Sequence, residues 1–590
     1  MESLMILVLV IAAVLAVFIK GAADERVKQR RQKRKIHEGF GAVPDRDYSD
    51  EELSSIPGYF SMHQEPEQVD DITWNDLGMD QLFFRMNQTY SSAGQEYLYY
   101  LLRTPQLKDA KALDAMEEKI TCFGQQEQMR EQLQYAYMQL GRSGKYSVYD
   151  YLNYLDNLGE RSSLSHIICD LLLIPAIGMV IVSPPLGMMF LFLLFTVNIF
   201  GYMKQKHEIE PYLTSFAYVR RILDFSARIR KMDIPVLKEE WEELKILEGK
   251  FGKFRYSAML GMRGSDTAGD PLSLILDYVN MLLHLDLICF NTMLKEVRKH
   301  LMDIDRMITI AGKTEACIAI ASYRASLASG WCSPRLAEDS RESVRLEIRG
   351  LYHPLLEEPV KNDILAKQGI LVTGSNASGK STFLKAVALN ALLAQTIHTC
   401  TADFYSGGLY RIMTSMALRD DLEGGESYYI VEIKSLKRIL DAAREGSAPV
   451  LCFVDEVLRG TNTVERIAAS TQILRSLSRP GVLCFAATHD IELTELLDAS
   501  APSSIERELF LSIDAQGNIC MAEKSGNTLA YMFDNAGQFL FSLSYEGNLM
   551  TTITTAEGQI GVCASAADRM SYDLLHVDMK SRDWSEDRIH

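Results

Sequence analysis

Two glycines, a lysine and a hydroxyl residue stand at a characteristic spacing in the second half of the chain. Gly374, Gly379, Lys380 and Ser381 match the pattern G-x-x-x-x-G-K-[ST]. In such a loop the backbone N–H groups and the N-terminus of the following helix face phosphate groups. Lys380 is expected to reach the β- and γ-phosphates of ATP, and the Ser381 hydroxyl to ligate Mg²⁺. The residues expected to bind the nucleotide are Gly374, Ser375, Asn376, Ala377, Ser378, Gly379, Lys380, Ser381 and Thr382.

Two carboxylates follow an apolar run at 450–454. Asp455 is expected to hold the Mg²⁺ ion through water, and Glu456 to orient or deprotonate the attacking water. The plainer alternative is an acidic pair that caps the next turn. The position downstream of the phosphate-binding pattern favours the catalytic interpretation.

A second apolar run, 483–487, ends in Thr488 and His489. In a parallel sheet, ligands bind at the carboxyl ends of the strands. His489 is therefore a candidate to sense the γ-phosphate or to hydrogen-bond the lytic water. An ordinary loop histidine is the alternative, because histidine has many structural uses.

The elements that must position these side chains change character along the chain. Residues 70–160 and 207–330 show apolar residues at helical spacing, most clearly in Pro271–Leu301. From about Val344, short β-branched runs alternate with helical stretches, which is typical of a parallel sheet with crossover helices. The glycine-rich loop lies between the first such strand, Gly369–Thr373, and the first helix, so a merely structural glycine loop is disfavoured.

Two apolar regions are long enough to span a membrane. Residues Ser3–Ile19 carry no charge and a cluster of positive charges follows them, which favours an uncleaved anchor over a signal peptide. Residues Ile167–Met203 are interrupted at Ser183 by a turn signal, which predicts a transmembrane hairpin rather than a buried soluble helix pair. About three spans place the rest of the chain in the cytosol, and we expect a multi-pass protein of the cell membrane.

Charge and cysteine content exclude some classes of function. The formal net charge is −17, so any nucleic-acid contact requires a local basic face. The ten cysteines are scattered without a CxxC pair, which favours reduced thiols over a zinc site.

The ordered motifs resemble those of the MutS family of ATPases. The loop Gly374–Thr382 has the family's G-x-N-x-x-G-K-S-T form, with Asn376 in place. Segment 420–432 resembles the family's D-D-L-x-x-G-x-S-x-F-x-x-E loop, and 455–463 its D-E-x-x-R-G-T-S-T signature. His353-Pro354 and the triplet Ala487-Thr488-His489 also resemble motifs of this family. Residues 73–103 are similar to the start of the family's helical lever domain.

The resemblance implies a composite nucleotide site in a homodimer. Ser427 of one subunit would approach, in trans, the γ-phosphate held by the loop of the other. The family also implies binding of duplex or branched DNA. The Phe-x-Glu triplet with which relatives read mismatches is absent from this sequence, so direct mismatch reading is in doubt. An aliphatic residue, Val360, lies near where the family stacks an aromatic on adenine, which leaves the preference for ATP over GTP undetermined.

We therefore predict seven segments and weigh three functions. The segments are an anchor (1–20), a basic juxtamembrane linker (21–69), a first helical core segment (70–165), a transmembrane hairpin (166–203), a second helical core segment (204–343), a P-loop ATPase domain with an ABC-type parallel sheet (344–500) and a divergent C-terminal region (501–590). A membrane-tethered ATPase that clamps DNA is the main hypothesis. An ATP-driven membrane scaffold without DNA binding is the alternative, and a transporter is disfavoured because only Asp170 lies as a charge within the apolar hairpin.

Overall fold

The computed structural model forms two compact units. The first comprises Met1–Leu371, Ser381–Asn462 and Gln472–Ala487, and the second Val372–Lys380, Thr463–Thr471 and Thr488–His590. The structure describes residues 2–108, 110–144, 146–156, 159, 161–261, 281–337, 345–374, 378–416, 428–457, 463–498, 508–513, 516, 519–524, 528–533, 539–545, 548–554, 559–565, 572–578 and 583–589.

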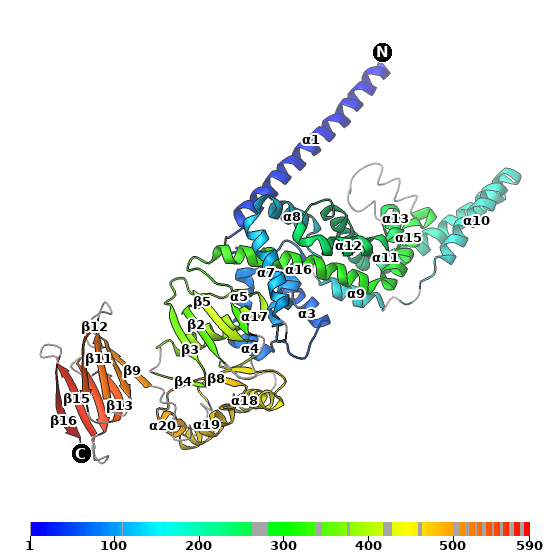
Figure 1. Ribbon diagram of the computed structural model, residues 1–590. Coiled ribbons are helices and arrows are strands. Elements are labelled where there is room, and N and C mark those ends of the chain that lie inside the picture. Colours follow the sequence, from blue (N-terminus) through cyan, green and yellow to red (C-terminus); the bar gives the residue numbers. More distant parts are fainter. Residues whose placement is uncertain are drawn as a thin grey trace. The chain divides into compact units, whose positions relative to one another are not determined.

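The first half of the chain is helical, which confirms the expectation from periodicity (Figure 1). Its described helices are α1 (Glu2–Gly39), α2 (Asp50–Ser55), α3 (Gly58–Met62), α4 (Asp71–Asp76), α5 (Met79–Met86), α6 (Ser92–Arg103), α7 (Lys111–Gln125), α8 (Glu127–Leu140), α9 (Val148–Asp156), α10 (Leu164–Val182), α11 (Pro184–Ile229), the 3₁₀ turn η1 (Pro235–Leu237), α12 (Lys238–Gly249), α13 (Gly252–Gly261), α15 (Leu285–Lys299) and α16 (Leu301–Ser326).

Helix α16 is the centre of this region, and α6 and α7 pack against it. A close approach of two backbones occurs at Gly312, where an added Cβ would lie 2.5 Å from the Ala93 carbonyl oxygen. Only glycine allows the two backbones to come so near. Of the expected helical stretch Pro271–Leu301, the residues up to 280 lie outside the described residues, and α15 covers most of the remainder.

Helix α1 extends beyond the expected anchor. It continues without a break to Gly39, into the segment expected as a basic linker. Residues 22–38 contain neither glycine nor proline and are rich in strong helix formers, which explains the continuation. The later portion of that segment is also packed, because Tyr59 on α3 is only 3% exposed.

Helices α10 and α11 form the expected apolar hairpin, with a break at Ser183. They approach closely, since a Cβ on Gly187 would lie 2.3 Å from the Val180 backbone nitrogen. Leu164–Val182 and Pro184–Ile209 are long and apolar enough to cross a membrane, and little of either is buried. Helix α11 runs on to Ile229, past the expected boundary at residue 203, although Gly201 and Pro211 lie within it.

The α/β region confirms the expected alternation. Its elements are β1 (Arg335–Ala337), β2 (Leu346–Leu351), β3 (Asn362–Ala366), β4 (Ile370–Thr373), α17 (Lys380–Thr396), β5 (Phe404–Gly408), β6 (Arg411–Ser415), α18 (Tyr428–Glu445), β7 (Val450–Asp455), α19 (Thr463–Leu477), β8 (Val482–Thr488) and α20 (Glu492–Asp498). One sheet has the order β1-β5-β2-β3 and another β4-β8-β7-β6. Strands β6, β7 and β8 are parallel, and β7 and β8 are buried throughout.

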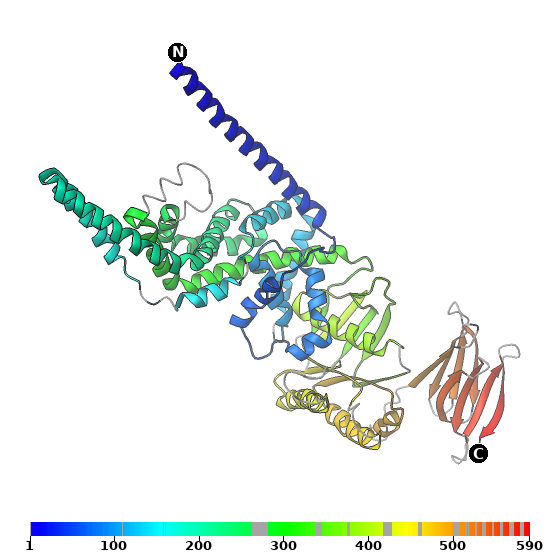
Figure 2. The same ribbon diagram turned by 180° about the vertical axis from the view of Figure 1, so that it is seen from behind.

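The C-terminal region, whose order the sequence left open, contains two four-stranded antiparallel sheets (Figure 2). Their strands are β9 (Glu508–Ile513), β10 (Ile519–Lys524), β11 (Thr528–Phe533), β12 (Phe539–Tyr545), β13 (Asn548–Thr554), β14 (Ile560–Ser565), β15 (Tyr572–Asp578) and β16 (Asp583–Ile589). Both sheets contribute to one apolar core, with Met532 from the first and Leu575 from the second. Packing of this kind defines a β-sandwich.

Candidate nucleotide-binding site

The glycine-rich loop joins β4 to α17, the context that the sequence predicts. Gly374 has φ +154° and Gly379 has φ +86°, values that side chains with a Cβ rarely adopt. A Cβ on Gly374 would also lie 3.1 Å from the Ser378 hydroxyl oxygen. The two glycines therefore permit the sharp turn from strand to helix. The predicted residues Ser375, Asn376 and Ala377 lie outside the described residues.

Lys380 is buried at the first position of α17 and turns back over its own loop. Its Nζ donates a hydrogen bond to the Gly374 carbonyl oxygen at 2.8 Å. The same Nζ lies 3.5 Å from both ring nitrogens of His489. Lys380 is only 8% exposed, and its ammonium group is placed to meet an anion that enters the loop. The structure thus brings together two of the three predicted catalytic residues.

Ser381, the next residue of α17, contacts the end of β7. Its hydroxyl donates a hydrogen bond to the Asp455 carboxylate. Asp455 is 9% exposed, and its second oxygen, Oδ1, has no hydrogen-bond partner among the described residues. Buried polar atoms without a partner are uncommon and often mark an ion site. A hydroxyl and a carboxylate are oxygen donors of the kind that Mg²⁺ prefers, so the pair fits the predicted metal site.

Glu456 follows Asp455 in an unusual backbone conformation. Its φ is +56°, although it is not glycine. Its N–H donates to the Ala487 carbonyl oxygen at 2.9 Å, which holds the residue at the end of β8. Strained residues of this kind cluster at functional sites, because the surrounding structure must enforce them. The role of Glu456 beside the metal ligand stays a prediction.

The sequence did not identify an ion pair that fixes the segment after His489. Arg466 on α19 donates to both carboxylate oxygens of Asp490, at 2.8 and 2.6 Å. The Asp490 N–H also donates to the Thr488 hydroxyl at 3.0 Å. These bonds anchor both neighbours of His489 and limit where its ring can lie. No sequence signal marks the pair, because its members are 24 residues apart.

Four further residues from the sequence motifs lie either outside the described residues or away from the contacts above. Ser427, expected to act in trans, lies outside the described residues, as does the segment 417–427. Glu432 at the end of that motif is buried on α18. Burial and the nearby charge of Lys385 lower the pKa of His353 to about 4, so this histidine is neutral at pH 7. Val360 is 79% exposed.

Comparisons with known proteins find one family that resembles this part of the chain. The family MutS domain V matches residues 370–527, which includes the loop, both strand-end acids and the first strands of the C-terminal region. A DNA mismatch repair protein MutS from Thermotoga sp. (strain RQ2) is 36% identical over 215 residues, which are 35% of this chain and 26% of that protein. The protein of the same name from Thermus aquaticus is 38% identical over 172 residues, 28% of this chain and 20% of its own length.

The match is confined to one region of each protein. The chain spans about a quarter of the length of the curated relatives that it matches. The matched region contains the loop, the Ser381–Asp455 pair and Glu456, and its described strands form the sheet that positions them. The comparisons therefore support the MutS family for this region of the chain, through its similarity to domain V.

Proposed function

We propose that this protein is a membrane-tethered MutS-like ATPase that binds and hydrolyses ATP with Mg²⁺ and clamps DNA. The observation that carries the ATPase assignment is the hydrogen bond from the Ser381 hydroxyl to a buried Asp455 carboxylate whose other oxygen has no described partner. Its position at the carboxyl end of β7, next to the turn that carries Lys380, is where a P-loop enzyme binds Mg-nucleotide.

Each residue has a distinct role in the proposed reaction. Loop N–H groups and the Lys380 ammonium bind the phosphates, and Ser381 and Asp455 hold Mg²⁺. The bound ion would neutralise charge on the phosphate oxygens. Glu456 orients the attacking water and accepts its proton. His489, beside the Lys380 ammonium, is placed to hydrogen-bond the same water or the γ-phosphate.

Turnover of ATP by the purified chain tests the assignment. We expect Lys380→Ala and Glu456→Ala each to remove most of the activity, because phosphate binding and water activation are separate requirements. Lys367→Ala is the matched control, since Lys367 is exposed in the turn before β4. Equal turnover in the wild type and Lys380→Ala would refute the assignment.

DNA binding and dimer formation are proposed from the relatives, whose name is DNA mismatch repair protein MutS. In a homodimer Ser427 of one subunit would complete the site of the other, so that ATP and ADP offer different contacts to the partner. A gel-shift series at several salt concentrations, with and without a non-hydrolysable ATP analogue, tests this proposal. We expect retention of duplex or branched DNA that weakens steeply with salt.

Membrane tethering is proposed from exposed apolar side chains on the hairpin of α10 and α11. Val182, at the tip, is 86% exposed, and Phe192 and Phe200 on α11 are 75% and 74% exposed. Such surface is unfavourable in water, and lipid would cover it. Together with Ser3–Ile19, the hairpin gives about three spans, with the ATPase domain in the cytoplasm. Recovery of the chain in the soluble fraction of cells after lysis without detergent would contradict the tethering.

The same hairpin, with the net charge of −17, favours one other function. An ATP-driven scaffold at the membrane would keep the nucleotide site and bind no DNA. ATP turnover without any retained DNA at low salt would select this function over the clamp.

A further inference from the structure

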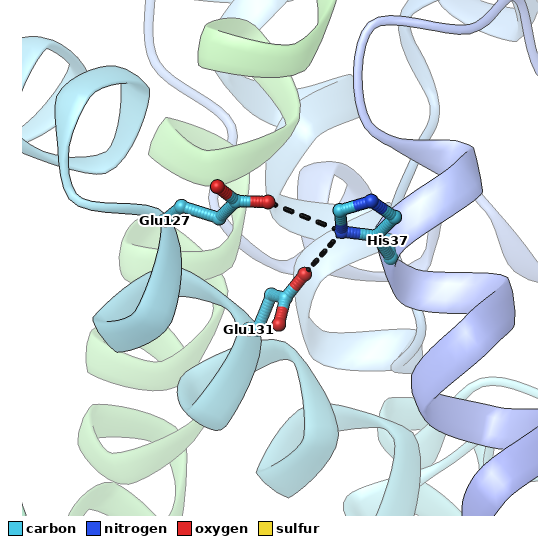
Figure 3. Close-up of side chains that lie close together, drawn as sticks. All are labelled: His37, Glu127 and Glu131. Atoms are coloured by element: carbon cyan, nitrogen blue, oxygen red, sulfur yellow. Dashed lines mark hydrogen bonds and ion pairs between the residues drawn. The ribbon is translucent and has the colours of Figure 1, made fainter.

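Three side chains outside the nucleotide site converge where helix α1 ends. His37 is near the C-terminus of α1, and Glu127 and Glu131 lie one turn apart on α8 (Figure 3). The His37 Nδ1 is 3.1 Å from a Glu127 carboxylate oxygen and 2.8 Å from a Glu131 carboxylate oxygen. One ligand atom of each residue lies within 4.8 Å of those of the other two.

A hydrogen bond alone accounts poorly for this arrangement. One ring nitrogen carries at most one proton, yet two carboxylate oxygens converge on that nitrogen. Two carboxylates one helical turn apart also repel each other. Arg130, between them in the sequence, is directed elsewhere: it donates to the Phe123 carbonyl oxygen at 2.9 Å and stacks on the Phe40 ring at 3.5 Å.

The distances match those between ligands that share a metal ion. Metal–nitrogen and metal–oxygen bonds of about 2.0–2.2 Å place neighbouring ligand atoms about 2.8–3.6 Å apart, for coordination angles between octahedral and tetrahedral. The observed 3.1 and 2.8 Å lie at the short end of this range. One imidazole and two carboxylates form a ligand set for divalent transition metals such as Zn²⁺. All three side chains are accessible enough for water to fill the remaining positions.

The backbone around His37 is held in place by contacts that do not involve the three side chains. Ile36 is 1% exposed. The Gly39 carbonyl oxygen accepts a hydrogen bond from Gln88 Nε2 at 2.8 Å, and the Gly41 N–H donates to the Ser322 hydroxyl at 3.0 Å. Ligands held on rigid elements keep their geometry before the ion arrives, which favours binding.

We propose that His37, Glu127 and Glu131 form a binding site for one divalent transition-metal ion, of the Zn²⁺ class, that fastens helix α1 to helix α8. The ion replaces the proton of the His37 Nδ1 and neutralises both carboxylates. Because α1 is a single helix from Glu2 to Gly39, the bound metal ion fixes the direction in which that helix leaves the helical region. The proposal depends on neither ATP hydrolysis nor membrane insertion.

The test is titration of the full chain, freed of metal and of nucleotide, with Co²⁺, whose visible absorption reports nitrogen and oxygen ligands. We expect His37→Ala and Glu131→Gln each to lower the affinity of this site for Co²⁺ by more than about tenfold. Tenfold is the lower end of what loss of a supporting group costs a metal site. Since His37 is exposed and glutamine has the shape of glutamate, both variants should fold. His207→Ala is the control, because His207 is an exposed histidine on α11.

A second measurement separates a metal clamp from a simple ion pair. We expect added Zn²⁺ to slow amide hydrogen exchange in residues 30–39 of the wild type and to leave exchange in His37→Ala unchanged. Identical Co²⁺ titrations for wild type and His37→Ala would overturn the proposal. Exchange in residues 30–39 that does not respond to Zn²⁺ would also overturn it, because His37 would then act only through its proton.

Discussion

Replacing Asp76 by alanine removes the acceptor of two buried hydrogen bonds between the helical region and strand β6. One Asp76 carboxylate oxygen accepts from the Thr414 hydroxyl at 2.7 Å and from the Met416 N–H at 2.9 Å. Thr414 is fully buried and Met416 is 7% exposed, so water cannot easily replace the lost acceptor. Each buried donor left without a partner costs about 1–3 kcal/mol, and the two together about 2–6 kcal/mol.

Amide hydrogen exchange of residues 411–416 measures this loss directly, because the Met416 N–H is one of the two donors. A cost of about 2 kcal/mol or more corresponds to exchange at least about 30-fold faster in Asp76→Ala. Asp76→Asn is the matched control, since its amide oxygen can still accept both bonds and should preserve most of the protection. Unchanged exchange in Asp76→Ala, or equal acceleration in both variants, would refute the reasoning.

Three further predictions concern the Mg²⁺ ligand Ser381, the buried Glu96 and the half-buried Glu117. Ser381→Ala should raise the Mg²⁺ concentration for half-maximal ATP turnover by at least about tenfold, because Asp455 alone would hold the ion; a Mg²⁺ titration of activity checks this. Burial raises the pKa of Glu96 from 4.5 to about 8, so the folded state retains a proton that the unfolded chain releases. Thermal stability should therefore fall as pH rises from about 4.5 to 8, and Glu96→Gln should flatten that dependence. Burial opposes ionisation of Glu117, but hydrogen bonds from Arg324 and His398 outweigh it and lower its pKa to about 2. The stability that Glu117 contributes is therefore complete above pH 4.5 and lost as pH falls towards 2, and acid unfolding of Glu117→Gln should lack this component.

The sequence signals for the candidate nucleotide site are local. The glycine spacing, the apolar run before Asp455 and the run before His489 each report one turn at a strand end. The fold then needs only to place those turns along one edge of a parallel sheet, which is a general property of such sheets. Lys380 and His489 meet as that rule predicts.

The features that could not be predicted depend on contacts between distant residues. Asp76 and Thr414 are 338 residues apart, and neither belongs to a motif whose spacing would connect them. Arg324 and Glu117, 207 residues apart, likewise form an ion pair only after α7 and α16 have packed. The β-sandwich was missed for another reason: its strands are short, and alternation over six or seven residues between turns is a weak signal in a single sequence.

The register of the parallel sheet connects the proposed Mg²⁺ site at Ser381 and Asp455 to the helical region. Ser415 on β6 pairs with Val454 on β7, so Met416 and Asp455 follow at neighbouring positions where the two strands end. Met416 donates to Asp76 on α4, while Asp455 accepts from Ser381. We therefore expect a shift of Asp455 towards a bound ion to act on strand β6 through the pairing of β6 with β7, and then on Asp76 through its hydrogen bond from Met416. The decisive comparison is exchange in residues 411–416 with and without Mg-ATP: we expect slower exchange in the wild type and a smaller difference in Asp76→Ala, whereas an equal difference in both would show that the contact transmits nothing.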